Sequence, residues 1–232
     1  MLKYILTFLF LSSFLSNGAV TWTGNAGTNI FDGGNYSGLA DGFTLEPNVT
    51  VEDDITFSNA TVTIPQVSAQ QRFQVASGFT MTVDGSNFSL SGGSNDGIGG
   101  APGSRLPAGP AGPTLNIING SSLEAFFIVN GVQMNVDGTS SVTLGGAGNP
   151  VNISSINLDT GATLSFTRET IAQFNTEHLS KITINGVAAE EGLNFTIAAL
   201  GAGGSTITAI PEPSAGLLGA IGCILLFLRR RR

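Results

Sequence analysis

The sequence predicts an all-β fold, a right-handed parallel β-helix or β-solenoid, and three observations support this prediction. Short alternations of apolar and polar residues recur along the chain, with turn residues at their edges. Glycine is abundant at 32 residues, while charged residues make up 11%, which excludes a coiled coil or a charged helical bundle. Related segments also recur at unequal spacings. A β-sandwich shows the same alternation and turns, and it remains the alternative.

Two segments of the chain are clearly related. Met81 to Gly93 aligns with Met134 to Gly146 if one residue is inserted, and Ile117 to Phe126 and Asn157 to Phe166 are weaker relatives. Their turns are marked by glycines at intervals of 35, 18 and 23 residues, namely Gly85, Gly120, Gly138 and Gly161. The two shorter intervals suit one coil each, and the first leaves room for a second coil and a loop. The alternation directs Val83, Phe88 and Leu90 into the interior.

The N-terminal residues 1–19 are typical of a secretory signal peptide. Lys3 supplies a positive charge, Ile5 to Leu15 is apolar, and small residues follow at Ser16 to Ala19. The alternative, an uncleaved anchor helix, is disfavoured because the apolar segment is short. The chain is therefore expected to be exported.

The body of the protein is assigned to residues 20–208, with two departures from the strand pattern. Residues 92–114 are rich in Gly and Pro, and we expect a long loop there that splits the solenoid. Thr167 to Lys181 predicts one short helix, with Ile171 and Phe174 on the same face.

The C-terminal residues 209–232 contain three distinct parts in sequence. A Pro-Glu-Pro motif comes first, then an uncharged apolar segment at 215–228, and then four arginines. As a helix the apolar segment extends about 21 Å, against a bilayer core of about 30 Å, so it predicts a marginal transmembrane helix. The arginines would keep the chain end cytoplasmic. The residues involved are Pro211, Glu212, Pro213, Arg229, Arg230, Arg231 and Arg232.

This three-part order resembles the PEP-CTERM sorting signal of Gram-negative bacteria. The resemblance implies that Pro211, Glu212 and Pro213 are recognised by an exosortase, a membrane protease-transpeptidase, and that Arg229 to Arg232 hold the chain transiently in the inner membrane. Removal of the tail would then leave the protein at the cell surface or outside the cell. The body also loosely resembles autotransporter-type surface proteins, with an opening repeat at Thr21 to Gly38 and a closing repeat over 181–210.

The charges and the single histidine exclude several function classes. From Asp32 to Glu191 the chain carries 15 acidic and four basic residues, so nucleic-acid binding is not expected. His178 is the one histidine, which excludes a multi-histidine metal site. Glu52 to Asp54 is expected to be a solvated turn rather than a calcium site. No catalytic residue, metal ligand or cofactor is therefore predicted.

The sequence thus predicts a non-enzymatic structural protein of the cell surface or extracellular matrix, associated with exopolysaccharide or biofilm. A carbohydrate-binding module is the first alternative, and Trp22 and Tyr36 would be its exposed aromatic residues. A β-helix polysaccharide lyase is the second, although no residues can be nominated for it.

Overall fold

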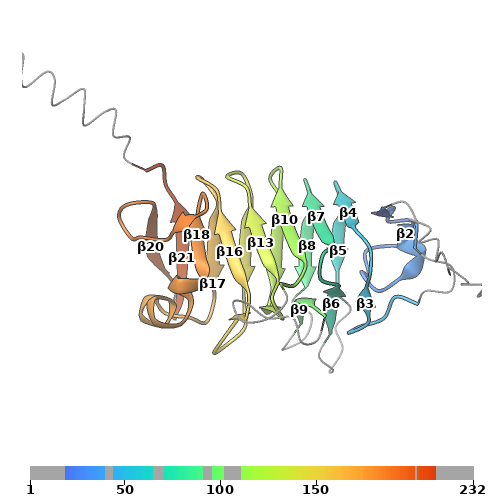
Figure 1. Cartoon of the computed structure of the whole chain (residues 1–232), viewed down its shortest axis with the longest axis horizontal. Helices are drawn as coiled ribbons and strands as arrows, with labels where there is room; N and C mark the ends of the chain where they lie inside the picture. The colour runs from blue at the N-terminus through green and yellow to red at the C-terminus, as the bar shows by residue number, and fades with distance from the viewer. Residues whose placement is uncertain are drawn as a thin grey trace, which may run out of the picture.

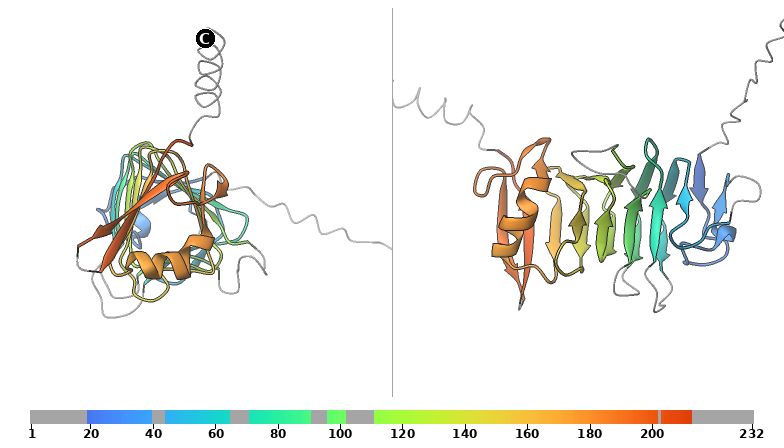
Figure 2. Two further views of the ribbon diagram at one scale, coloured as in Figure 1. Left: turned by 90° about the vertical axis from the view of Figure 1, so that its left-hand side faces the viewer. Right: turned by 60° about the horizontal axis from the view of Figure 1, so that its bottom comes forward.

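The computed structural model describes residues 19–39, 44–64, 71–90, 96–101, 111–201 and 203–212. These residues form an elongated stack of strands, with the N-terminal strands at one end and the C-terminal strands at the other (Figure 1). Viewed along the stack, the strands outline a three-sided cross-section (Figure 2). Each side corresponds to one sheet.

The first sheet, sheet A, runs the full length of the stack. Its strands, in spatial order, are β19 (Val187–Ala188), β18 (Ile182–Ile184), β16 (Ser155–Leu158), β13 (Gln133–Val136), β10 (Thr114–Ile118), β7 (Thr80–Asp84), β4 (Ile55–Ser58), β1 (Val20–Trp22) and β2 (Tyr36–Ser37). From β1 to β18 every neighbouring pair is parallel.

The other two sides are built in the same way. Sheet B contains β20 (Phe195–Leu200), β21 (Gly204–Ala209), β17 (Thr163–Phe166), β14 (Ser141–Leu144), β11 (Ser122–Ala125), β8 (Asn87–Leu90) and β5 (Thr61–Thr63). Sheet C contains β15 (Val151–Asn152), β12 (Phe127–Val129), β9 (Gly97–Gly100), β6 (Arg72–Val75) and β3 (Thr50–Val51). From β4 to β15 the chain visits sheets A, B and C in turn, so each of these circuits adds one strand to each sheet.

The predicted all-β class and its parallel sheets are confirmed. A β-sandwich would place antiparallel strands side by side, whereas antiparallel pairs among the described strands occur at the two ends of the stack. Each central strand instead pairs with the strand one circuit later, because the connection between them is a whole coil.

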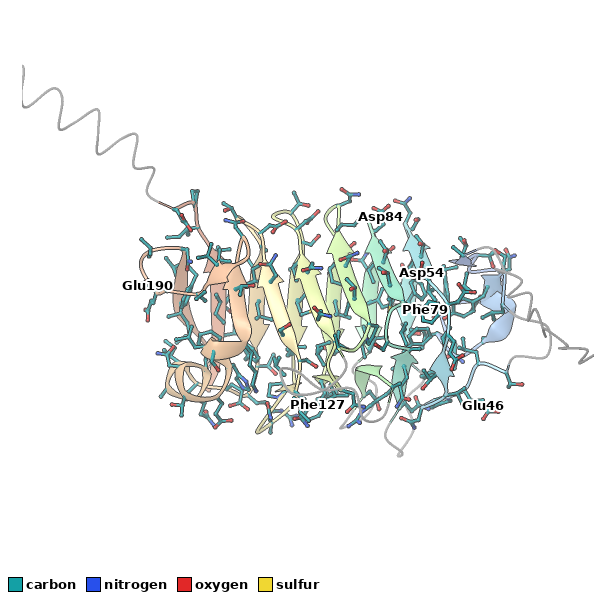
Figure 3. All side chains as sticks on the ribbon, in the orientation of Figure 1. Glu46, Asp54, Phe79, Asp84, Phe127 and Glu190 are labelled. Atoms are coloured by element: carbon teal, nitrogen blue, oxygen red, sulfur yellow. The ribbon has the colours of Figure 1, made fainter. Side chains whose placement is uncertain are left out.

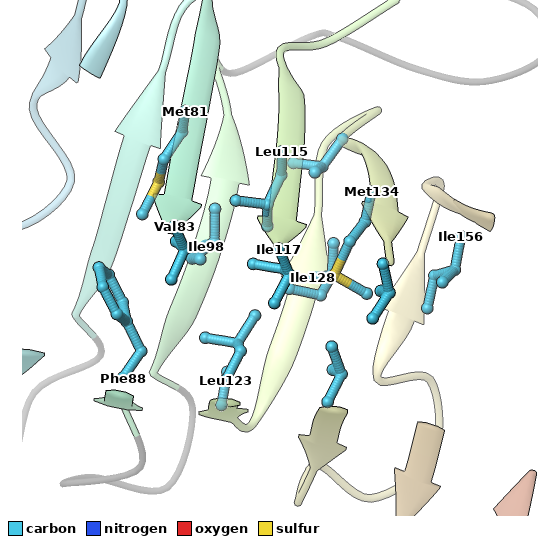
Figure 4. Close-up of a cluster of buried hydrophobic side chains, with 14 of the residues drawn as sticks. Met81, Val83, Phe88, Ile98, Leu115, Ile117, Leu123, Ile128, Met134 and Ile156 are labelled. Carbon is cyan, nitrogen blue, oxygen red and sulfur yellow. The ribbon is translucent and has the colours of Figure 1, made fainter. Parts of the chain in front are cut away.

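Apolar side chains fill the interior in columns that run along the stack. Met81, Leu115, Met134 and Ile156 form one column, since their strands pair in register (Figure 4). The two segments that align in the sequence therefore lie two coils apart in the same column. Val83, Phe88 and Leu90 point inward as predicted and are at most 2% exposed.

Serines satisfy the backbone at the buried corner between sheets A and B. The N–H group of Ala60 donates to Oγ of Ser86 (2.8 Å), that of Ser86 to Oγ of Ser121 (3.0 Å), and that of Ser121 to Oγ of Ser140 (3.1 Å). All three serines are at most 3% exposed. Each coil thus supplies the acceptor that the corner of the preceding coil needs.

The predicted long loop at 92–114 does not split the solenoid, because Gly97–Gly100 form β9 between β6 and β12. The glycines that suggested a loop are required by close stacking. A Cβ atom on Gly97 would lie 2.0 Å from the carbonyl oxygen of Phe127, and one on Gly100 would lie 2.2 Å from that of Asn130. Residues 92–95 and 102–110 of this segment lie outside the described residues.

The spacing of the turn glycines also needs one correction. Gly85 and Gly120 occupy the same corner of adjacent coils, and the N–H group of Gly85 donates to the carbonyl of Ile118. The 35-residue interval between them is therefore one enlarged coil, and it does not contain a second coil. By contrast, Ile117 pairs with Val136 in the next coil, 19 residues later.

The predicted helix is present but is composite. It begins with one α-helical turn, α1 (Ile171–Gln173), continues as a π-turn, η2 (Phe174–His178), and ends as a 3₁₀ turn, η3 (Leu179–Lys181). It follows β17 of sheet B and precedes β18 of sheet A, so it takes the place of the next strand of sheet C. Phe174 is buried, and Ile171 is half-buried.

Candidate functional site

The predicted sorting motif follows directly on the last strand. β21 ends at Ala209, and the N–H group of Ile210 donates to the carbonyl of Asn194 (2.9 Å). Pro211 and Glu212 come next and are exposed. Pro213, the apolar segment 215–228 and Arg229 to Arg232 lie outside the described residues, as does most of the predicted signal peptide, residues 1–18. None of the helices in the described ranges is long and apolar enough to cross a membrane.

The outer face of sheet B carries columns of small polar side chains. Thr61, Asn87, Ser122 and Ser141 face outward in one column, and Thr63, Ser89, Glu124 and Thr143 in the next. Oγ of Ser122 donates to Oδ1 of Asn87 (2.7 Å). The columns line a shallow depression of about 270 Å³. This face offers hydroxyl and amide groups at intervals of about 4.8 Å, the spacing of neighbouring strands.

The outer face of sheet A is similar but richer in asparagine. Thr82, Asn116, Asn135, Asn157 and Thr183 are paired in register along the sheet. Nδ2 of Asn135 donates to Oδ1 of Asn116 (3.0 Å), and Oγ1 of Thr183 donates to Oδ1 of Asn157 (2.9 Å). Acidic side chains such as Asp84 and Glu190 lie at the periphery of the molecule (Figure 3). Both outer faces are therefore hydrophilic, with few charges in their columns.

The two aromatic residues proposed for carbohydrate binding do not form an exposed platform. Trp22 is 8% exposed, packs edge-on against Tyr36 with ring centroids 5.1 Å apart, and also contacts Phe57. The Tyr36 hydroxyl donates to the carbonyl of Ile30 (2.6 Å), and burial raises its pKa well above the ordinary value. Both rings close the N-terminal end of the core, so the prediction that they are exposed is wrong.

The acidic segment from Glu52 to Asp54 links β3 to β4, as predicted for a turn. Its side chains satisfy backbone groups: Oδ1 of Asp54 accepts from the N–H group of Thr80 (2.7 Å), and Oδ1 of Asp53 accepts from that of Asp54 (2.8 Å). These contacts give the two aspartates a structural role.

A different group of side chains comes together at the composite helix formed by α1, η2 and η3. In the part of the chain that the structure describes, Glu169, Glu177 and His178 form the one group of three His, Cys, Asp or Glu residues whose ligand atoms are close, within 4.8 Å of one another. Glu169 is 1% exposed and His178 is fully buried, while Glu177 is exposed. The sequence prediction of no metal ligand did not consider this group.

Burial controls the ionisation of these side chains. Burial, assisted by the positive charge of Lys181, lowers the pKa of His178 to about 4, so the imidazole is neutral at pH 7. Burial also raises the pKa of Glu169 above its ordinary value; the Gly148 N–H group opposes this change, and the charge of Glu177 adds to it. Nothing in the local sequence signals the contact between Glu169 and Gly148, which lies 21 residues earlier.

Comparison of the chain with protein-family models, with curated proteins and with solved structures finds no match. Arguments about function therefore rest on the residues themselves.

Proposed function

We propose that this protein is an exported structural component of the cell surface or extracellular matrix, processed by an exosortase and associated with exopolysaccharide. The observation that carries the proposal is the Pro-Glu-Pro motif at Pro211 to Pro213, which starts two residues after the last strand, followed by an apolar segment and the arginine cluster Arg229 to Arg232. A recognition segment must be accessible and extended, and Pro211 and Glu212 are exposed. In this proposal the inner membrane holds the protein transiently.

The architecture of the body suits such a role. We infer a right-handed β-helix, since about 98% of connections between parallel strands of one sheet have that hand. Stacked coils need no disulfide bonds, and the one cysteine of the chain, Cys223, lies in the tail. This supports a rigid structural part that stays folded outside the cell.

The outer faces favour contact with a hydrated polysaccharide. The columns on sheets A and B present hydroxyl and amide groups, which exchange hydrogen bonds with sugar hydroxyls and water. Trp22 is buried and Tyr36 is half-buried with its ring packed edge-on against Trp22, so the aromatic stacking on which a specific sugar-binding site would depend is not offered by this pair. Broad association through the polar faces is therefore favoured over a single sugar pocket.

The decisive experiment measures the intact mass of the protein recovered outside its native cells, in strains with and without the exosortase. We expect the tail to be cleaved near Pro211 to Pro213 only in the strain that has the exosortase. Glu212→Gln should reduce processing, whereas Glu191→Gln, a matched change in an exposed acid of the body, should not. An intact tail in both strains would overturn the proposal.

A further inference from the structure

The composite helix (α1, η2 and η3) lies on the side of sheet C at the end of the stack and is attached to the preceding coil. Nζ of Lys181 donates to the carbonyl of Val151 and to Oδ1 of Asn149, both at 2.8 Å. The helix starts with a capping box between Thr170 and Gln173. It is the orange helix along one edge of the cross-section in Figure 2. A π-turn, which is rare and frequently lies at functional sites, then carries Glu177 and His178.

His178 is held by its ring face, and its nitrogens are left without hydrogen bonds. The imidazole stacks on Phe166 with ring centroids 5.1 Å apart and an angle of 4° between the planes. Both Nδ1 and Nε2 are buried and have no hydrogen-bond partner. Stacking occupies the face of the ring, so the lone pair of the neutral imidazole remains available in the ring plane.

Glu169 likewise has one buried polar atom without a hydrogen-bond partner. Its Oε1 accepts a hydrogen bond from the Gly148 N–H group at 2.7 Å, whereas its Oε2 is buried without a partner. Buried polar atoms are nearly always paired, so three unpaired atoms on two adjacent side chains require an explanation. A hydrogen bond between the two side chains is not formed, although their ligand atoms lie within 4.8 Å.

We propose that Glu169, Glu177 and His178 bind a divalent cation of the Zn²⁺ class. One imidazole nitrogen and carboxylate oxygens are ligands that zinc accepts, with a water molecule to complete four-coordination. Ligands at about 2.1 Å in a tetrahedral site lie about 3.4 Å apart, so the three side chains need only small rotations to converge. Calcium and magnesium favour oxygen ligands alone, which makes them poorer fits.

The surroundings support this assignment. The imidazole is neutral at pH 7, as a metal ligand must be. The Gly148 N–H group fixes the Glu169 carboxylate in the manner of outer-shell partners at metal sites. Glu177 is exposed and gives an ion access from solvent. The ion would fix Glu169 to the π-turn, and Glu169, which accepts from the Gly148 N–H group, would link this segment to the preceding coil.

The test uses the full chain in detergent, without a histidine tag, and with Cys223→Ser in every sample to remove the tail thiol. After treatment with a chelator, Zn²⁺ binding is measured by equilibrium dialysis and the unfolding temperature is recorded with and without Zn²⁺. We expect one Zn²⁺ per chain and a higher unfolding temperature. Co²⁺ in the same site should give the intense visible absorption of a four-coordinate ion.

Two variants and one control locate the site. His178→Phe keeps the ring stacked on Phe166 but removes both nitrogens, and it should abolish binding. Glu177→Gln changes an exposed residue with little risk to folding and should weaken binding at least tenfold. Glu191→Gln, also exposed, should leave binding unchanged. Absence of Zn²⁺ binding in the parent chain, or unchanged affinity in Glu177→Gln, would overturn the proposal.

Discussion

A buried corner in the middle of the stack and the C-terminal end differ in whether their buried polar groups have hydrogen-bond partners. In the middle coils, Ser86, Ser121 and Ser140 accept hydrogen bonds from the corner of the preceding coil. At the end, Glu169 and His178 are as deeply buried but have polar atoms without partners. At the serine corner each acceptor comes from the coil that follows, so the last coil needs elements of another kind.

The elements at that end are indeed different. The hairpin of β20 and β21 pairs antiparallel with β17, and β19 pairs antiparallel with β18. The composite helix replaces a strand of sheet C. The end of the stack therefore depends on specific side-chain contacts, while the middle depends on register.

The largest expected effect comes from apolar packing in the middle of the stack. Ile117→Ala removes a fully buried side chain that stacks between Val83 and Val136, and it should cost about 2–5 kcal/mol of unfolding free energy. Ile171→Ala, at a half-buried position of the composite helix, should lower the free energy of unfolding by about 1 kcal/mol or less. Urea unfolding of both variants measures the difference. Equal costs would contradict the difference in burial between these two positions.

The second prediction concerns acid stability in the presence of a chelator. The unfolded chain protonates His178 near pH 6.5, whereas the folded protein does so near pH 4. Stability is therefore fully present above pH 6.5 and is lost as pH falls to 4, by up to about 3 kcal/mol. Burial raises the pKa of Glu169, so its contribution to stability increases as pH falls, opposite to that of His178. The charges of Lys181 and Glu177 also face this region.

Comparison with His178→Phe isolates the contribution of the imidazole. Unfolding free energies of both proteins are measured from pH 7.5 to pH 4, and the variant should lose less stability than the parent over this range. Parallel curves for the two proteins would contradict the assigned protonation of His178.

The third and smallest prediction tests the serine ladder of the middle coils. Ser121→Ala leaves the buried N–H group of Ser86 without an acceptor and should cost about 1–3 kcal/mol. The neighbouring outward hydroxyl of Ser122 serves as the control, and Ser122→Ala should change stability by about 0.5 kcal/mol or less. Chemical unfolding measures the free energy of unfolding of both variants. An unchanged value for Ser121→Ala would mean that the corner relaxes or admits water.

The parts of the fold that repeat could be predicted from the sequence. The alternation that placed Val83 and Phe88 inward, and the alignment of Met81 with Met134, both follow from the two-residue period of strands and from register between coils. The turn between β3 and β4 was likewise visible in its short acidic residues.

The parts that depend on neighbours from other coils could not be predicted. β9 has the composition of a loop, yet its glycines are dictated by the carbonyls of Phe127 and Asn130, some 30 residues later. Trp22 is buried and Tyr36 half-buried because both rings pack against Phe57 at the end of the core. Glu169 and His178 come close together because a π-turn places His178, and this turn has no clear sequence signature.

The two ends of sheet A bear on how this protein can assemble. An open parallel edge would accept a further strand from another molecule, and a chain of such contacts would grow into a fibre. Here the terminal strands of sheet A are two-residue strands, β2 and β19, and sheet B ends in a hairpin. End-to-end growth through sheet A is thus disfavoured, because a two-residue strand offers few free backbone groups to the strand of another molecule.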